Sequence, residues 1–361
     1  MQLDAVSGPL PLHDMQRLAR EIEDAGFGGL WLFESGRTAY LSCAAAALAT
    51  EHITIGTAIA VAFPRSPMVT AQTAWELQQA SGGRFVCGLG TQVKAHVERR
   101  YGVSFERPGP RLREYVLAMK AMFRAFRQLE KPGFVGEFYR FDLLPDMWSP
   151  GAIEPPDPPI YTAGVNPWML RMCAEVADGL HVHPLNTPRY TNEVILPSID
   201  EGAQRAGRDP ADIKLAFPLF TIVGDTDDER EQWRQMTRFQ IGFYGSTRTY
   251  RRIFELHGWD DVPERLHELQ AKGDFAGLAA TITDEMIDEF AVTSDWDGLP
   301  DAIRARYDGV ADRVLAYFST HGWNQGRAQL DRWRAVARAI NAAQGPERPG
   351  AEGTKSGKVV R

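Results

Sequence analysis

Cysteine and long apolar runs are scarce in this 361-residue sequence, and each scarcity excludes a class of protein. The three cysteines, Cys43, Cys87 and Cys173, lack CxxC spacing, so we expect reduced core residues rather than disulfides or metal ligands. The longest apolar run, residues 53–63, is too short to cross a bilayer, and the chain does not begin with a basic segment followed by an apolar run. We therefore expect a cytoplasmic protein that neither enters nor crosses a membrane.

Excess positive charge is also missing. The formal net charge is -7, from 40 Lys and Arg against 47 Asp and Glu, whereas phosphate binding needs clustered basic residues. We therefore expect no nucleic-acid partner.

Several catalytic signatures are absent or incomplete. The sequence has no GxSxG elbow, and the glycine spacing of residues 353–358 does not fit a P-loop. Gly88 and Gly90 begin like a dinucleotide fingerprint, but no third glycine opens a helix after them. These observations argue against a serine hydrolase, a P-loop enzyme and a Rossmann domain.

The chain does contain a regular alternation of buried-strand and helix patterns. It predicts strands at residues 3–6, 28–33, 53–61, 84–90, 160–164, 178–183, 213–223, 287–293 and 313–318. It predicts helices at residues 12–25 (closed by Gly26), 41–50, 67–81, 109–127 and 167–177, one ending near 207, a helical stretch over 226–272 with breaks at Gly242, Gly245 and Gly258, and helices at 299–307 and 326–343.

Parallel strands that alternate with helices form either a closed TIM (β/α)8 barrel or an open doubly wound sheet, and the number of units favours the barrel. Because one strand more than eight is predicted, we expect one short strand to be a connection. We expect a single domain over residues 1–344, with residues 131–159, including a hairpin at 136–141, as an active-site cover. Residues 345–361 have the composition of a disordered tail.

Polar residues follow several predicted strands, and ligands of parallel α/β folds bind at that edge. His181 and His183 lie two apart on one strand, so both face the same side, as two metal ligands would. No carboxylate or further histidine follows nearby, and we expect these residues to line a site without binding a metal.

At this point a family resemblance becomes specific. The pattern of Ile55-Gly56-Thr57-Ala58-Ile59, Arg65-Ser66-Pro67, Ser81-Gly82-Gly83-Arg84-Phe85 and Gly88-Leu89-Gly90 resembles the bacterial-luciferase-like superfamily of flavin- and deazaflavin-dependent oxidoreductases. The resemblance covers about residues 1–340, and the residues from Gly90 to Arg100 are most similar to the branch that depends on coenzyme F420.

The resemblance implies a TIM-like barrel with insertions, a homodimer formed through the early helices, and a ring cofactor at the carboxyl ends of the strands. Thr57-Ala58-Ile59 matches the position of a non-prolyl cis peptide that bulges against the ring; the alternative for Ala58 and Ile59 is ordinary barrel packing.

The acid and base residues of the related alcohol dehydrogenases do not carry over. Glu34 and Ser35 stand at their Asp-His pair, and Val93 stands at their catalytic Glu. Oxidation of an alcohol needs a base near the hydroxyl, so either the substrate differs or the proton is handled by another residue. The candidates are Glu34, Lys94, His96 and His183, although Lys94 and His96 fit a surface loop equally well and Glu34 fits a role in orienting the ring.

The remaining candidates are cofactor contacts implied by the resemblance. Thr91 and Gln92 fit either the ring edge or a simple turn, and Arg65 fits a structural ion pair better than a phosphate contact. The full set of predicted cofactor-binding residues is Ser35, Ala58, Ile59, Thr91, Gln92, Val93, Ala163, Gly164, Val165 and Asn186. The last four are placed at the phosphate-bearing end.

The resulting hypothesis is an F420-dependent oxidoreductase that moves a hydride between the deazaflavin C5 and a small organic substrate. Two alternatives stay open: an FMN-dependent two-component monooxygenase, and a non-catalytic flavin-binding relative, which the missing His and Glu make conceivable.

Overall fold

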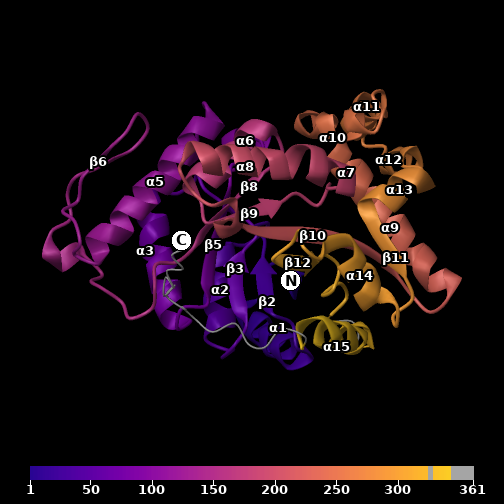
Figure 1. Cartoon of the computed structure of the whole chain (residues 1–361), viewed down its shortest axis with the longest axis horizontal. Coiled ribbons are helices and arrows are strands. Elements are labelled where there is room, and N and C mark those ends of the chain that lie inside the picture. Colours follow the sequence, from indigo (N-terminus) through magenta and orange to yellow (C-terminus); the bar gives the residue numbers. More distant parts are fainter. Residues whose placement is uncertain (324–327, 343–361) are drawn as a thin grey trace, which may run out of the picture.

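A computed structural model describes residues 1–323 and 328–342, and its centre is a closed barrel of parallel strands (Figure 1). In barrel order the described strands are β1 (Gln2–Ser7), β2 (Gly29–Leu32), β3 (Thr54–Thr57), β5 (Phe85–Gly90), β8 (Ile160–Gly164), β9 (Gly179–Val182), β10 (Lys214–Val223) and β12 (Arg313–Ala316). β9 pairs with β10, and β12 pairs with both β10 and β1, so the ring closes. This confirms the predicted TIM-type barrel.

Two layers of apolar side chains hold the barrel together. The strands are buried on both faces, and one inner cluster fills the barrel with Val6, Trp31, Val86, Tyr161, Ala216 and Leu315. Their outward faces pack on surrounding helices: α1 (Leu12–Ala25), α2 (Ala39–Ala47), α3 (Pro67–Ala80), α5 (Pro108–Phe126), α6 (Pro167–Val176), α8 (Leu196–Arg205), α14 (Leu299–Tyr307) and α15 (Ala328–Asn341).

The predicted apolar stripe of the first helix and its glycine stop are confirmed. Met15, Leu18 and Ile22 of α1 are fully buried, and Gly26 ends the helix with a φ of 89°, in the left-handed region. The second helix is displaced from its predicted span of 41–50, because it already begins at Ala39 after the extended Thr38.

The strand predicted at 287–293, the eighth along the chain, is wrong in its first half. Residues 287–290 belong to the helix α13 (Asp284–Phe290), and only β11 (Ala291–Ser294) is extended. Thr283 caps this helix by accepting a hydrogen bond from the Met286 N–H, and that start signal outweighs the apolar run. β11 pairs only with the last four residues of β10, so it is the expected extra strand outside the barrel.

A helical insertion follows β10. It contains α9 (Asp227–Gly245), η4 (Arg248–Tyr250), α10 (Arg251–Leu256), α11 (Val262–Lys272), α12 (Phe275–Thr281) and α13. The predicted breaks at Gly245 and Gly258 are confirmed, but Gly242 lies inside α9. Gly242 serves packing instead, because a Cβ at this position would lie 2.8 Å from the Leu278 carbonyl oxygen of α12.

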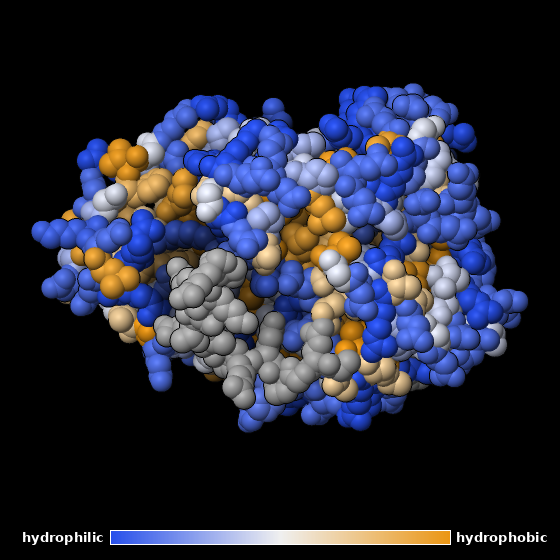
Figure 2. All heavy atoms as spheres, in the orientation of Figure 1, coloured by the Kyte–Doolittle hydropathy of each residue, from blue (hydrophilic) through white to orange (hydrophobic). Residues whose placement is uncertain are grey.

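The segment 131–159 contains a hairpin that begins two residues before the predicted span of 136–141, with β6 (Phe134–Val135) paired to β7 (Arg140–Phe141). The Glu114 carboxylate of α5 accepts hydrogen bonds from three successive backbone N–H groups of the turn, and Trp75 of α3 donates to the Gly151 carbonyl. These contacts fasten the segment to α3 and α5, and the role of an active-site cover stays a prediction. The face of the molecule in Figure 2 is mainly hydrophilic, with hydrophobic patches toward the end where β6 lies and others in the middle of the face.

Three further sequence predictions concern the cysteines, membrane-spanning segments and the C-terminal tail. Cys43, Cys87 and Cys173 are free and buried, as expected for reduced core residues. Within the described residues no helix is both long and apolar enough to span a membrane. The tail predicted at 345–361 lies outside the described residues.

A buried ion pair ties together the amino-terminal end of the barrel. Asp4 of β1 is fully buried and accepts hydrogen bonds from the Arg313 guanidinium of β12, at 2.9 and 3.2 Å, and from the Trp31 indole of β2, at 2.7 Å. Arg313 also donates to the Thr54 hydroxyl of β3 at 2.9 Å. One carboxylate and one guanidinium therefore connect four neighbouring strands.

Removal of this carboxylate should destabilise the whole barrel. Asp4→Ala leaves a buried guanidinium without its counter-charge, which typically costs about 3–5 kcal/mol of unfolding free energy. Asp301→Ala is the matched control, because its ion pair with Arg304 is exposed and contributes less than about 1 kcal/mol. Urea denaturation of both variants measures the difference; equal losses would contradict a central role for Asp4.

Candidate active site

Side chains at the carboxyl ends of the barrel strands are less buried than those inside the barrel. Alternate residues of each strand face the barrel interior, so the inner positions below the mouth, such as Trp31, Tyr161 and Leu315, are buried. Two residues further along the same strands, Phe33, Ala163 and Tyr317 are half-buried. The exposure of inward-facing residues at this level shows that the mouth is open.

One side of the mouth is an apolar wall formed where the predicted strand 53–61 divides. β3 ends at Thr57, β4 (Ala60–Val61) follows, and the peptide bond between Ala58 and Ile59 is cis, at the position predicted from the resemblance. Ile59 lies across Gly90 of β5, since a Cβ on Gly90 would be 2.7 Å from the Ile59 side chain. Ala58, Ile59 and Ala163 are half-buried and offer no polar side-chain atom, so this wall suits the face of a planar ring.

Thr57 fastens the wall to the neighbouring strand. Its hydroxyl donates to the Gly88 carbonyl at 2.7 Å and accepts from the Gly88 N–H at 2.8 Å. Gly88 cannot carry a side chain, because a Cβ would lie 1.8 Å from the Thr57 carbonyl oxygen and 2.6 Å from His181 Nε2. The glycine pattern that signalled the family therefore has a packing reason.

Glu34 is held in a buried ion pair. Its carboxylate accepts two hydrogen bonds from the Arg65 guanidinium, at 2.5 and 3.0 Å, and one from the Val61 N–H at 2.8 Å. Arg65 also donates to the Thr38 hydroxyl, and its ion-pair interpretation is confirmed. The Glu34 carboxylate fixes the loop after β4, and this geometry leaves it poorly placed to take a proton from a substrate.

The residues after β5 form a turn and the short helix α4 (Lys94–Arg99), which the sequence did not indicate. Gln92 has a φ of 57°, and its side-chain oxygen accepts a hydrogen bond from the Val93 N–H. Its amide nitrogen has no hydrogen-bond partner among the residues that the structure describes. Thr91 and Val93 are half-buried beside it.

The two candidate residues on α4 are exposed. Lys94 lies 3.9 Å from Glu98, and the His96 side chain, one turn from the mouth, makes no hydrogen bond or ion pair that would orient it within the described part of the chain. Ser35, on the neighbouring loop, uses its carbonyl oxygen to accept from Arg100.

Three predicted cofactor contacts, at residues 163–165, follow one another at the end of β8. Because successive strand residues face opposite sides, they do not all face the mouth. Ala163 faces the interior beside His181, whereas Gly164 faces outward, where a Cβ would lie 3.0 Å from the Met169 Cβ of α6. The Val165 carbonyl accepts a hydrogen bond from the Tyr190 hydroxyl at 3.0 Å. Only backbone atoms of Gly164 are thus available to a ligand in the mouth.

His183 is a neutral hydrogen-bond donor at the mouth. Its Nδ1 accepts from the Leu185 N–H at 3.1 Å, which leaves the proton on Nε2. Burial lowers the pKa of His183 to about 3, and the ring packs against Tyr244 and Tyr250 at centroid distances of 4.9 and 4.2 Å. His183 can therefore donate from Nε2, but it is a poor base at neutral pH.

The described residues include no group of three or more His, Cys, Asp or Glu side chains close enough to hold a metal ion. His181 lies one layer below His183 and contacts Trp31 and Tyr161 at ring distances of 4.9 and 5.4 Å. It belongs to the aromatic floor beneath the mouth.

Three tyrosines complete the mouth, and sequence reasoning missed them. Tyr317 follows β12, whereas Tyr244 and Tyr250 come from α9 and η4 of the insertion. Tyr317 lies two residues after the inward-facing Leu315, and this spacing could have indicated that Tyr317 also faces the mouth. Nothing in the local sequence of Tyr244 or Tyr250 indicated that their helices fold back over β9.

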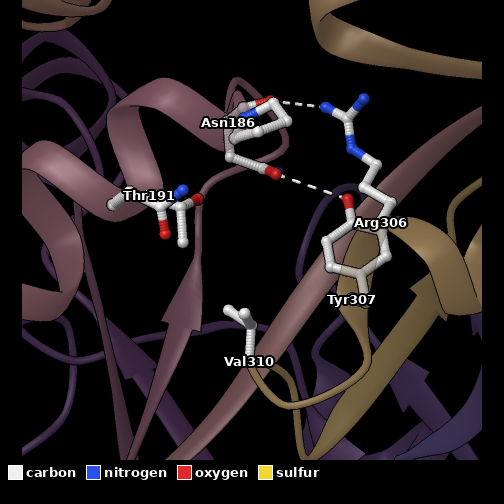
Figure 3. Close-up of a pocket in the computed structure, with 7 residues that line it drawn as sticks. Asn186, Thr191, Arg306, Tyr307 and Val310 are labelled. Atoms are coloured by element: carbon white, nitrogen blue, oxygen red, sulfur yellow. Dashed lines mark hydrogen bonds between the residues drawn. The ribbon is translucent and has the colours of Figure 1, made fainter.

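The Asn186 side chain lies beside a small pocket outside the mouth, and its polar atoms are hydrogen-bonded to other residues of the protein (Figure 3). Its amide nitrogen donates to the His183 and Pro218 carbonyls at 3.0 and 3.1 Å, and its oxygen accepts from the Tyr307 hydroxyl at 3.4 Å. This side chain holds the loop after His183 against β10 and α14, and a direct cofactor contact stays a prediction.

Comparison with known proteins gives one family. The model of a family described as luciferase-like monooxygenase matches residues 2–313. An uncharacterized protein of Mycobacterium tuberculosis is 39% identical over 297 residues, covering 82% of this chain and 87% of that protein. The 5,10-methylenetetrahydromethanopterin reductase of Archaeoglobus fulgidus is 30% identical over 308 residues, covering 83% and 86%.

Solved structures agree on the fold. The coenzyme F420-dependent tetrahydromethanopterin reductase of Methanopyrus kandleri has a TM-score of 0.76 at 21% identity, covering 95% of this chain and 99% of that one. An F420-dependent secondary alcohol dehydrogenase with an F420-acetone adduct has a TM-score of 0.73 at 20% identity, covering 94% and 99%. The oxygenating constituent of the Pseudomonas putida 3,6-diketocamphane monooxygenase, in complex with FMN, has a TM-score of 0.64 at 17% identity, covering 95% and 98%.

The buried ring of His181 predicts a pH dependence of stability. Burial lowers its pKa to about 3, outweighing the opposing effect of the Thr57 backbone, whereas an unfolded histidine has a pKa of about 6.5. Below pH 6.5 the unfolded chain binds a proton that the folded chain excludes, so the stabilisation is complete above pH 6.5 and is lost as the pH falls toward 3.

At pH 5 this loss is about 2 kcal/mol, since each pH unit below 6.5 is worth about 1.4 kcal/mol. His181→Gln should therefore lose about 2 kcal/mol less than the wild type between pH 7 and pH 5, as measured by urea denaturation. An identical pH dependence of the two proteins would show that His181 takes up its proton in the folded state.

Proposed function

Because this chain belongs to the luciferase-like monooxygenase family, we propose that it is an oxidoreductase that binds coenzyme F420 in the barrel mouth and acts on a small organic substrate. The cofactor, when bound, supplies the hydride chemistry at its ring C5. The protein binds and orients the ring, keeps water from it and handles the accompanying proton.

The observation that carries this proposal is the pairing of an apolar wall with neutral hydrogen-bond donors at the mouth of the barrel. Ala58, Ile59 and Ala163 offer a surface without polar side-chain atoms. His183 presents Nε2–H, and Gln92 presents its side-chain amide nitrogen. A planar ring with an apolar face and carbonyl-bearing edges fits this arrangement.

The charged groups of the mouth support a binding role more than an acid-base role. Glu34 and Arg65 neutralise each other and brace the loop after β4. Lys94 and His96 are exposed on α4, where they would meet only the outer part of a bound ligand. Among the four catalytic candidates, His183 is therefore the one that we place against the ring or the substrate, as a donor.

The preference for F420 over FMN rests on the relatives. The Archaeoglobus reductase matches over most of both chains, and two structural neighbours are F420-dependent by name. The FMN-bound diketocamphane monooxygenase has a lower TM-score, 0.64, and a lower identity, 17%. An FMN-dependent monooxygenase is accordingly the alternative for the same site.

Fluorescence titration of the purified protein with F420 and with FMN tests the cofactor assignment. The proposal expects saturable F420 binding that is tighter than FMN binding. Tight FMN binding without an F420 response would replace the proposal with its alternative, and binding of either without turnover would favour a non-catalytic relative.

A side chain at Gly164 should weaken cofactor binding while the barrel stays folded. Gly164→Val would press on Met169 and displace the end of β8 with its neighbour Ala163, so we expect the dissociation constant for F420 to rise about tenfold or more. Gly133→Val is the control, because a Cβ there meets only the Lys131 carbonyl oxygen, at 3.7 Å, outside the mouth. Unchanged affinity in Gly164→Val would show that the cofactor does not contact this strand end.

A further inference from the structure

Two tyrosine hydroxyls meet at the rim of the mouth. The Tyr317 hydroxyl, at the end of β12, is hydrogen-bonded to the Tyr244 hydroxyl of α9. Phe220 and Phe318 hold the Tyr317 ring at centroid distances of 5.2 and 5.3 Å, and the Tyr244 ring lies 4.9 Å from His183. Both tyrosines are half-buried, so this pair adjoins the space that a ligand would occupy.

Each tyrosine hydroxyl has one proton to donate and an oxygen that can accept, so the pair can pass a proton from one ring to the other. With Tyr244 as donor, its hydroxyl proton is shared with the Tyr317 oxygen, and the Tyr317 proton is left for a ligand. The two hydroxyls then form a short line of donors from α9 to the end of β12.

Among the described residues, none of the four catalytic candidates that the sequence indicated is a positioned proton donor for this task. The Glu34 carboxylate is occupied by Arg65 and the Val61 N–H, and His183 is neutral with Nδ1 already accepting. The position of Val93 has no ionisable group, and Lys94 and His96 are exposed on α4. A hydride transfer to a carbonyl carbon needs one proton for the oxygen, and it must come from a positioned donor.

We propose that Tyr317, backed by Tyr244, is the proton donor of the reaction and that the substrate is a carbonyl compound; this rests on the proposed function. The hydride from the reduced deazaflavin forms the new C–H bond, and the C=O π electrons move to the oxygen. The oxygen takes the Tyr317 hydroxyl proton, Tyr317 regains one from Tyr244, and Tyr244 regains one from solvent. The product is an alcohol, both tyrosines end neutral, and alcohol oxidation follows the same steps in reverse.

The experiment uses the full chain with reduced F420 and a panel of aldehydes, ketones and enones that ranges in size from acetone to naphthaldehyde. Tyr317→Phe should lower kcat by about 100-fold or more, as loss of a general acid does, and Tyr244→Phe should cause a smaller loss. The dissociation constant for F420, measured by fluorescence, should be unchanged in both variants. Tyr115→Phe is the matched control, because its hydroxyl is hydrogen-bonded to the Thr70 hydroxyl between α3 and α5.

Each other outcome has a definite meaning. Reduction of a carbonyl compound at the wild-type rate by Tyr317→Phe would overturn the assignment. Binding of reduced F420 by the wild type with no turnover of any carbonyl compound would overturn the substrate class and leave the cofactor proposal standing. Absence of F420 binding would instead sink the proposed function itself.

Discussion

The period of two along each barrel strand is the constraint on which the site depends. In a closed barrel only every second residue faces inward, so one row of positions decides both the core and the mouth. Trp31 and Phe33, Tyr161 and Ala163, His181 and His183, and Leu315 and Tyr317 are such pairs, with the first member buried and the second half-buried. If the register of one strand shifted by one residue, the half-buried member of its pair would face outward and leave the mouth.

The buried charges at both ends of the barrel are each neutralised by a neighbouring charge of opposite sign. Asp4 with Arg313 closes the amino-terminal end, and Glu34 with Arg65 braces the loop at the other end. Each carboxylate also accepts from an uncharged N–H, so neither buried group is left without partners. Lys94 is exposed on α4, but the other polar residues that the described part of the chain leaves at the mouth, Gln92, His183 and the three tyrosines, are uncharged. This set suits chemistry on a ring cofactor better than hydrolysis by a free carboxylate.

The barrel and the apolar wall at Ala58 and Ile59 could be predicted because the sequence patterns that specify them are local. Glycines at 88 and 90, the apolar runs and the stop at Gly26 each reflect a packing or φ requirement that the sequence displays directly. The helix at Ile287 and the continuous helix at Gly242 were missed, because a cap at Thr283 and a contact with Leu278 outweighed local composition. Tyr244 and Tyr250 were missed for a stronger reason: their position depends on where a 60-residue-scale insertion docks, which no short pattern encodes.

The length of β10 has a consequence for the shape of the barrel. Its first six residues belong to the barrel through β9 and β12, but Phe220–Val223 continue past the rim and pair with β11. At about 3.3 Å per residue these four add roughly 13 Å of height on one side, and the insertion stands on that extension. The barrel is therefore taller on the side of β10 than on the side of β2, which ends at Leu32, and the helical insertion that carries Tyr244 and Tyr250 begins from the taller side.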